Sequence, residues 1–297
     1  MRFLVKSRAK TGFMIRFGIH ASLRNGLNNA IEQALASGCE AMQMFTKSPR
    51  IWNSAVYSQK DISSFQYALK TSKLSPLIVH TFYLQNLATS NEELYQKSFT
   101  AFEKDLLLAS KIGAKYYVIH PGSYSENASL EDGIERIAKS INAIYSKHDI
   151  KTTVLLENLA GEGRKIGSNF TELAQIISKI DNKLKIAVCF DTAHAFGAGY
   201  DLSNTKKIDL LLKDFDDIVG LEKLKVIHFN DSKMPLASKK DRHEHLGDGM
   251  IGAKGLEYFV KTVRDIAEAG IIETPKEPEG SDALNLKKLF KWRGKSA

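Results

Sequence analysis

The segments TVLLE at residues 153–157 and IAVCFD at residues 186–191 decide the fold of this chain. Each is a short, mostly apolar run that ends on a carboxylate. Such runs are typical of parallel strands that are covered on both faces. The intervening residues 170–180 carry apolar side chains at helical spacing. The two segments therefore predict a strand–helix–strand unit.

The same unit recurs along the chain in both directions. Strand patterns lie at residues 16–20, 41–45, 77–80, 116–120, 153–157, 186–191, 225–228 and 270–273. Helical patterns lie at residues 27–36, 62–73, 91–111, 130–147, 170–180, 208–218, 256–267 and 283–292. Eight alternations predict an α/β fold, a single-domain TIM (β/α)8 barrel, whose typical length is roughly 250 residues. An open doubly wound sheet is the alternative, but no GxxxxGK[ST] motif favours it.

The bulk composition limits the class of protein. No apolar run approaches the roughly 20 residues that span a bilayer, so we expect no membrane partner. The 42 basic and 34 acidic residues give a formal charge of +8, which favours a polyanionic partner. Cys39 and Cys189 form no CxxC pair, so we expect neither a disulfide framework nor a thiolate zinc site, and a reduced cytoplasm fits best.

The first residues differ from the rest of the chain. They contain Arg2, Lys6, Arg8 and Lys10 but no acidic residue, and their apolar run is too short for a secretory signal. We interpret residues 1–14 as a flexible basic extension, with Met14 as an alternative start and organellar targeting as another interpretation. Residues 15–297 form the predicted barrel domain.

Potential metal ligands recur where the predicted strands end. In a barrel, the carboxyl ends of all strands meet at one mouth, so these side chains are expected to converge there. Taken singly, each has a structural interpretation: a histidine can be a hydrogen-bonded core residue, and Glu157 or Asp191 can cap a helix. With two residues that follow the seventh strand, the candidates are His80, His120, Glu157, Asp191, His194, His228, Asp241, His243 and Glu273.

Nine candidates are too many for one catalytic zinc, which takes three protein ligands and a water. Two or three ions that share a bridging carboxylate fit the number better. Ions about 3.5–4 Å apart are a standard arrangement for in-line displacement at phosphorus. The pattern therefore predicts phosphodiester hydrolysis.

Six ordered motifs carry a family resemblance that extends from residue 15 to residue 279. They are HTFYLQNLA at His80, HPGS at His120, LLENLAGEG around Glu157, VCFDTAHAFGAGYD around Asp191, VIHFNDSKMPLASKKDRHEHLG at residues 226–247, and ETP at Glu273. The chain resembles the endonuclease IV family of apurinic/apyrimidinic endonucleases. The resemblance implies a DNA repair enzyme that cuts duplex DNA on the 5′ side of an abasic site, leaving a 3′-hydroxyl and a 5′-deoxyribose phosphate.

The resemblance also implies three zinc ions, with Mn²⁺ as a partial substitute, and a ligand set for each. One ion would be held by His80, His120 and Glu157. A second would share Glu157 and be held by Asp191, His228 and Glu273, while the third would be held by His194, Asp241 and His243. Glu157 and Glu273 would be the catalytic carboxylates.

Contacts to abasic duplex DNA follow from the same resemblance. Tyr83 and Leu84 match the family's wedge residues, and Arg50 in TKSPRIW matches its inserted arginine; core packing is the alternative for Tyr83 and Leu84. The family pattern is broken at Asn25, Gln85, Ala187 and Ala237. Four basic residues beside the last ligands can neutralise phosphates, although a solvated loop is an alternative: Lys233, Lys239, Lys240 and Arg242.

His20 and His245 have no ligand role by this resemblance, and a monomer is the expected oligomeric state. The alternative function is a metal-dependent sugar isomerase or epimerase of the xylose isomerase type, because such enzymes share the barrel. Their Mg²⁺ or Mn²⁺ sites favour carboxylate oxygens, so five histidine candidates count against this interpretation.

Overall fold

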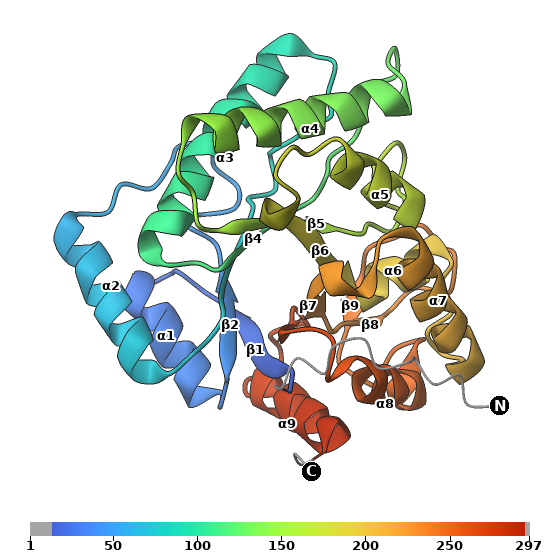
Figure 1. The fold of residues 1–297 in the computed structure, drawn as a ribbon. Helices are drawn as coiled ribbons and strands as arrows, with labels where there is room; N and C mark the ends of the chain where they lie inside the picture. Colours follow the sequence, from blue (N-terminus) through green and yellow to red (C-terminus); the bar gives the residue numbers. More distant parts are fainter. Residues whose placement is uncertain (1–13, 295–297) are drawn as a thin grey trace.

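The computed structural model describes residues 14–294 and shows a closed barrel of parallel strands (Figure 1). Consecutive barrel strands pair in parallel, and the last pairs with the first to close the sheet. The predicted TIM barrel is confirmed, and the open sheet is wrong. Most of the predicted N-terminal extension, residues 1–13, lies outside the described residues. The strands are β1 (Arg16–Ala21), β2 (Ala41–Met44), β3 (Leu77–His80), β4 (Tyr116–Ile119), β5 (Thr153–Glu157), β6 (Ile186–Asp191), β7 (Leu224–His228) and β10 (Ala269–Ile272).

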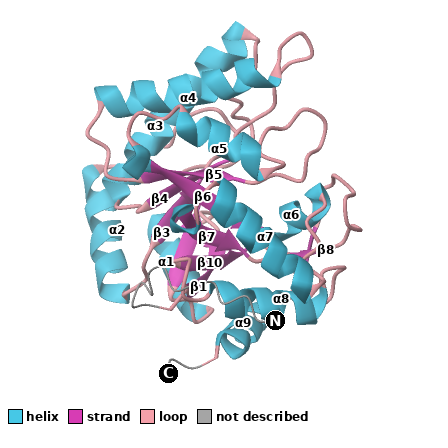
Figure 2. Cartoon of the chain, turned by 45° about the vertical axis from the view of Figure 1, so that its right-hand side comes forward, coloured by secondary structure: helices cyan, strands magenta, loops and turns pink. Residues whose placement is uncertain are grey.

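Helices surround the strands on the outside of the barrel (Figure 2). Several begin at capping residues that satisfy free backbone N–H groups, such as Ser58 and Ser129, each of which forms a capping box with an aspartate three residues on. The predicted helices correspond to α1 (Leu27–Ala36), α2 (Gln59–Ser72), α3 (Glu92–Ile112), α4 (Leu130–Lys147), α5 (Phe170–Ser178), α7 (Thr205–Ile218), α8 (Gly252–Val263) and α9 (Ser281–Arg293).

The structure adds short elements that the sequence patterns did not indicate. Helix α6 (Thr192–Ala198) begins immediately after β6, and strands β8 (Asp231–Ser232) and β9 (His243–Glu244) form a small antiparallel hairpin beside it. Two 3₁₀ turns, η1 (Lys183–Lys185) and η2 (Leu221–Lys223), precede β6 and β7. All are shorter than the periodic windows from which helices and strands are predicted.

The barrel interior is apolar toward its middle and polar at the mouth. Its apolar layer comprises Ala41, Ile78, Tyr116, Val118, Leu155, Ala187, Cys189, Val226, Ala269 and Ile271. Four candidate ligands are the last residues of their strands, whereas His120 and Glu273 lie one residue beyond β4 and β10, which end earlier than predicted. Within residues 14–294, no helix is both long enough and apolar enough to cross a membrane.

Candidate metal centre

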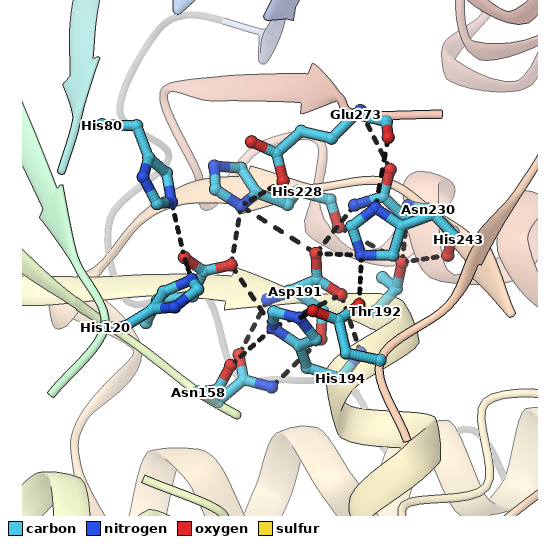
Figure 3. Close-up of polar contacts among 12 residues, drawn as sticks. His80, His120, Asn158, Asp191, Thr192, His194, His228, Asn230, His243 and Glu273 are labelled. Carbon is cyan, nitrogen blue, oxygen red and sulfur yellow. Dashed lines mark hydrogen bonds and ion pairs between the residues drawn. The ribbon is translucent and has the colours of Figure 1, made fainter. Parts of the chain in front are cut away.

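The nine candidate ligands lie together at the barrel mouth. Figure 3 labels all of them except Glu157 and Asp241. The mouth is a cavity of about 790 Å³, and His80, His120, His194, Asp241 and others line it. The remaining ligand candidates lie deeper: Glu157, Asp191 and His228 are fully buried. The closed sheet brings strand ends that are far apart in sequence into one polar cluster.

Glu157 is at the centre of this cluster. Its Oε2 lies 3.0 Å from His80 Nε2 and 3.1 Å from His120 Nε2, and its Oε1 lies 2.9 Å from His228 Nδ1. Burial raises the pKa of Glu157, but the charges of His228 and His120 outweigh burial and hold the pKa well below its ordinary value. Glu157 is therefore a carboxylate with both oxygens directed at imidazoles, as a bridging ligand requires.

Asp191 serves two structural roles at once. Its Oδ1 accepts a hydrogen bond of 2.7 Å from the backbone N–H of His194 and so caps α6. Its Oδ2 accepts a 2.7 Å hydrogen bond from Asn230 Nδ2 and lies 3.7 Å from His243 Nε2. Asp191 therefore both caps helix α6 and belongs to the polar cluster.

The β8–β9 hairpin and the loop that joins its two strands bring Asp241 and His243 to His194. Asp241 Oδ2 lies 3.0 Å from His194 Nε2, and Oδ1 lies 3.1 Å from His243 Nε2. Neither ring nitrogen has a partner with hydrogen-bond geometry among the described residues. Burial lowers the pKa of His243, but Asp191 and Asp241 raise it to about 9. Close approach without hydrogen-bond alignment is expected when ligand atoms point at a common third atom.

The second ring nitrogen of each buried histidine is held by an oxygen acceptor. His80, His194 and His243 donate their Nδ1–H to the backbone carbonyls of Thr81, Asn158 and Glu273, at 2.8, 2.9 and 3.2 Å. Because a carbonyl only accepts, these contacts leave Nε2 free to act as a ligand. Such contacts orient metal-binding histidines in general.

The donor set fits divalent cations. Among residues 14–294, no lysine or arginine forms an ion pair with Glu157, Asp191 or Glu273, whose partners are histidines. Buried carboxylates without a cation are costly, and a metal ion would supply the missing charge. Three groups have ligand atoms close enough to hold an ion: His80, Glu157 and His228; Asp191, His194 and His243; and Glu157, Asp191, His228 and Glu273.

The four-residue group coincides with the ligand set expected for the second ion. The other two differ from expectation by one member each: His228 stands in place of His120, and Asp191 in place of Asp241. His120 and Asp241 are nonetheless within 3.1 Å of Glu157 and His194, respectively. Mixed imidazole and carboxylate donors are typical of zinc sites.

Of the residues expected to contact DNA, Tyr83 lines the mouth, and Arg50 and Leu84 directly follow the lining residues Pro49 and Tyr83 in the sequence. The side chain of Arg50 is exposed, Tyr83 is 61% exposed and Leu84 is 38% exposed, so core packing does not explain them. The backbone N–H of Tyr83 donates to Pro49 O at 3.0 Å, which joins the two loops. The cations that precede and flank β9 are also exposed: Lys233, Lys239, Lys240 and Arg242.

Sequence reasoning missed several polar residues that organise the site. Asn158 and Asn230 hold Asp191, and their positions next to strand ends were the available signal. Asp231 does not join the cluster: its carboxylate accepts backbone hydrogen bonds from Gly247, Gly249 and Ile251 and so secures the segment that follows β9. Neither His20 nor His245 belongs to the three cation-binding groups, although His20 Nδ1 lies 2.9 Å from Glu273 Oε1.

Comparison with known proteins agrees with this geometry. A sequence profile of the family described as "Xylose isomerase-like TIM barrel" matches residues 31–292. The "Probable endonuclease 4" of Halothermothrix orenii is 44% identical over 262 residues, covering 88% of this chain and 94% of that protein. The chain belongs to the endonuclease IV family.

Solved structures separate this family from its structural neighbours. Endonuclease IV from Thermus thermophilus is 35% identical, with a TM-score of 0.81 and coverage of 93% of this chain and 98% of that chain. A D-tagatose 3-epimerase-like protein has a TM-score of 0.69 at 20% identity, covering 93% of this chain and 96% of that chain. The second likeness shows a shared fold alone.

Proposed function

We propose that this chain is a DNA repair endonuclease that hydrolyses the phosphodiester 5′ to an abasic site and leaves 3′-hydroxyl and 5′-deoxyribose phosphate ends. The observation that carries this proposal is the convergence of five imidazoles and four carboxylates at the barrel mouth of an endonuclease IV family member. Its substrate is double-stranded DNA that contains an abasic site, and its cofactor is a set of three zinc ions, with Mn²⁺ a partial substitute.

The ligands divide among the three ions as the family resemblance implies. Glu157 would be shared by two of the ions, because its Oε2 lies near His80 and its Oε1 lies near His228. Bound in this mouth, the ions supply Lewis acidity, which makes water a nucleophile at neutral pH and offsets charge on the phosphate. The sets are His80, His120 and Glu157; Glu157, Asp191, His228 and Glu273; and His194, Asp241 and His243.

The rim residues act on the DNA. Extruding an abasic nucleotide costs little stacking energy, so apolar side chains at the rim can occupy the vacated space. The exposed side chains of Tyr83 and Leu84 support this role, and Arg50 enters the duplex from the neighbouring loop. Lys239, Lys240 and the other cations of the loop between β8 and β9 bind backbone phosphates.

A sugar epimerase is the alternative, but no specific contact favours it. The epimerase-like structure shares the fold at 20% identity, whereas endonuclease IV shares 35%. Hard Mg²⁺ and Mn²⁺ ions prefer oxygen ligands, and the mouth of this barrel is rich in imidazole. The chain is therefore expected to leave ketose sugars unchanged.

The test is cleavage of a duplex that carries one tetrahydrofuran abasic analogue. The purified protein should contain about three zinc ions and nick this duplex on the 5′ side, and a chelator should abolish nicking. An undamaged duplex of the same sequence is the control. A protein that holds one Mg²⁺, fails to nick and epimerises a ketose would overturn the proposal. Light scattering should give the monomer mass of 33.1 kDa.

A further inference from the structure

Gln43 is a fully buried polar residue in β2, within the segment AMQM whose other residues are apolar. Its amide bridges two of the candidate ligands. Nε2 donates to Glu273 Oε1 at 2.7 Å, and Oε1 lies 2.9 Å from His228 Nε2. A buried amide is costly unless it is hydrogen-bonded, and these contacts satisfy both ends of the Gln43 side chain.

The neighbours of Gln43 determine which way its amide points. Glu273 Oε1 lies 2.7 Å from Gln43 Nε2 and 2.9 Å from His20 Nδ1, and a carboxylate that binds a cation does so in its ionised form. An ionised carboxylate only accepts hydrogen bonds, so the amide NH₂ of Gln43 must face Glu273. The amide oxygen then faces His228 and requires a hydrogen on Nε2.

This contact determines which nitrogen of His228 can act as a ligand. With Nε2 carrying the hydrogen, Nδ1 is directed at Glu157 Oε1 at 2.9 Å and at Glu273 Oε2 at 3.4 Å. His80, His194 and His243 use the opposite nitrogen. Gln43 therefore orients the ring of His228 through a side-chain hydrogen bond. Among the described residues, the other buried histidines of the cluster, His80 and His194, are oriented by backbone carbonyls.

Gln43 also determines how Glu273 is presented. Glu273 Oε1 receives hydrogen bonds from Gln43 and from His20 Nδ1, at 2.7 and 2.9 Å. Its other oxygen, Oε2, is the one directed at His228. One residue thus orients two ligands of the same four-residue group.

We propose that Gln43 is a positioning residue for the cation site formed by Glu157, Asp191, His228 and Glu273. It fixes the ring tautomer of His228 and directs one oxygen of Glu273 into the site. This inference rests on the proposed function in one respect, that these four residues bind a cation. A purely structural role would require only that the amide be hydrogen-bonded, and its loss would weaken folding without a selective effect on one cation.

The test uses Gln43→Met, which keeps the length of the side chain but removes both hydrogen bonds. The zinc-loaded wild-type protein and variant are titrated with a chromogenic chelator, without DNA. One equivalent of zinc should be released from the variant at a chelator concentration about 10- to 100-fold lower than from the wild type, and the remainder should be released as in the wild type. Cobalt-loaded Gln43→Met should also show altered visible absorption.

The matched control is Gln85→Met. Gln85 is also buried, but neither of its amide atoms has a hydrogen-bond partner among the described residues, so its replacement removes no such contact. Its zinc release should equal that of the wild type. If Gln43→Met does not fold, Gln43→Asn retains a buried amide that is one methylene too short to reach both ligands, and it should show the same selective loss.

The outcomes separate this inference from the proposed function. Identical zinc release from the wild type and both Gln43 variants would overturn the positioning role, as would an equal loss in Gln85→Met. A wild type that binds zinc but does not nick abasic DNA would overturn the endonuclease proposal alone, because zinc release is measured without DNA. A wild type that binds no cation would overturn both.

Discussion

Two buried groups of charged residues in this protein balance their charge in different ways. In the Lys47–Asp105 pair, both side chains are 2% exposed, and Lys47 Nζ lies 3.4 Å from Asp105 Oδ2. The same Nζ donates to Trp52 O at 3.1 Å and lies 3.6 Å from the centre of the Phe82 ring. At the barrel mouth, the carboxylates of Glu157 and Asp191 have histidines as their partners.

The difference shows which buried charges depend on a cofactor. Burial raises the pKa of Asp105 and lowers that of Lys47, but the pair contains one charge of each sign. The pair anchors the loop that contains Arg50 against helix α3, and it needs no bound ion to balance its charge. The mouth has an excess of ligand atoms over fixed positive charge, so we expect its stability to depend on bound cations.

Removal of the metal ions should have the largest effect. Each ion held at a thousand times its dissociation constant stabilises the fold by about 4 kcal/mol, so chelation of the three proposed ions should lower the melting temperature by about 20 °C. Calorimetry with and without chelator measures this shift, and nicking should cease in parallel. Lys47→Met should show the same metal-dependent shift as the wild type. An unchanged melting temperature would remove the contrast between the two regions.

Breaking the Lys47–Asp105 pair should have the next largest effect. Lys47→Met leaves Asp105 buried without its cation and should cost about 3–5 kcal/mol in urea unfolding, whereas Lys47→Met/Asp105→Leu should return close to wild-type stability. Zinc content should stay the same in both. If the double variant is as unstable as the single one, the unpaired charge of Asp105 is not the cause of the lost stability.

The loss in Lys47→Met should also depend on pH. Burial raises the pKa of Asp105 above its unfolded value, so protonation favours the folded state and this contribution is lost as pH rises through the folded pKa. The stability difference between the variant and the wild type should therefore be smaller at about pH 5 than at about pH 8. A difference that is independent of pH would contradict a charged Asp105 as the cause.

Asp241→Ala should affect chemistry more than binding. Asp241 is the most exposed carboxylate of the cluster and contacts His194 and His243. Single-turnover nicking should fall about 100-fold, while the affinity for abasic duplex measured by fluorescence anisotropy should change only a few-fold. The neighbouring Lys240→Ala is the control, and it should weaken DNA binding instead. Equal losses of nicking and binding in Asp241→Ala would contradict its assignment as a metal ligand.

An exposed ion pair should give the smallest effect and serves as the reference. Lys213 and Asp217 form such a pair one helical turn apart on α7. Exposed pairs gain little because water already solvates both charges. Lys213→Ala should leave the urea midpoint, zinc content and nicking rate unchanged. A clear loss of stability would show that burial is not what separates the two regions from ordinary surface charge.

Much of the architecture was predictable because its signals are local. Apolar strand patterns such as IAVCFD and the amphipathic stretches between them are readable from neighbouring residues. The carboxyl ends of parallel strands meet at one mouth, so the sequence alone predicts that His80, Glu157, Asp191 and His228 lie together. The short helix α6 and the β8–β9 hairpin could not be predicted in this way. A seven-residue helix and two-residue strands are too short to show a periodic pattern of apolar residues.

The sequence by itself determined the barrel, the end of the barrel that bears the chemistry, and the residue types gathered there. The tertiary structure alone decided how those residues are presented. Gln43 and His228 are 185 positions apart in the sequence, and no local pattern connects them. Closure of the sheet brings Gln43 Oε1 to 2.9 Å from His228 Nε2. For His228, the choice between Nδ1 and Nε2 as the ligand atom depends on this long-range contact, because the hydrogen bond made by one ring nitrogen decides what the other can bind.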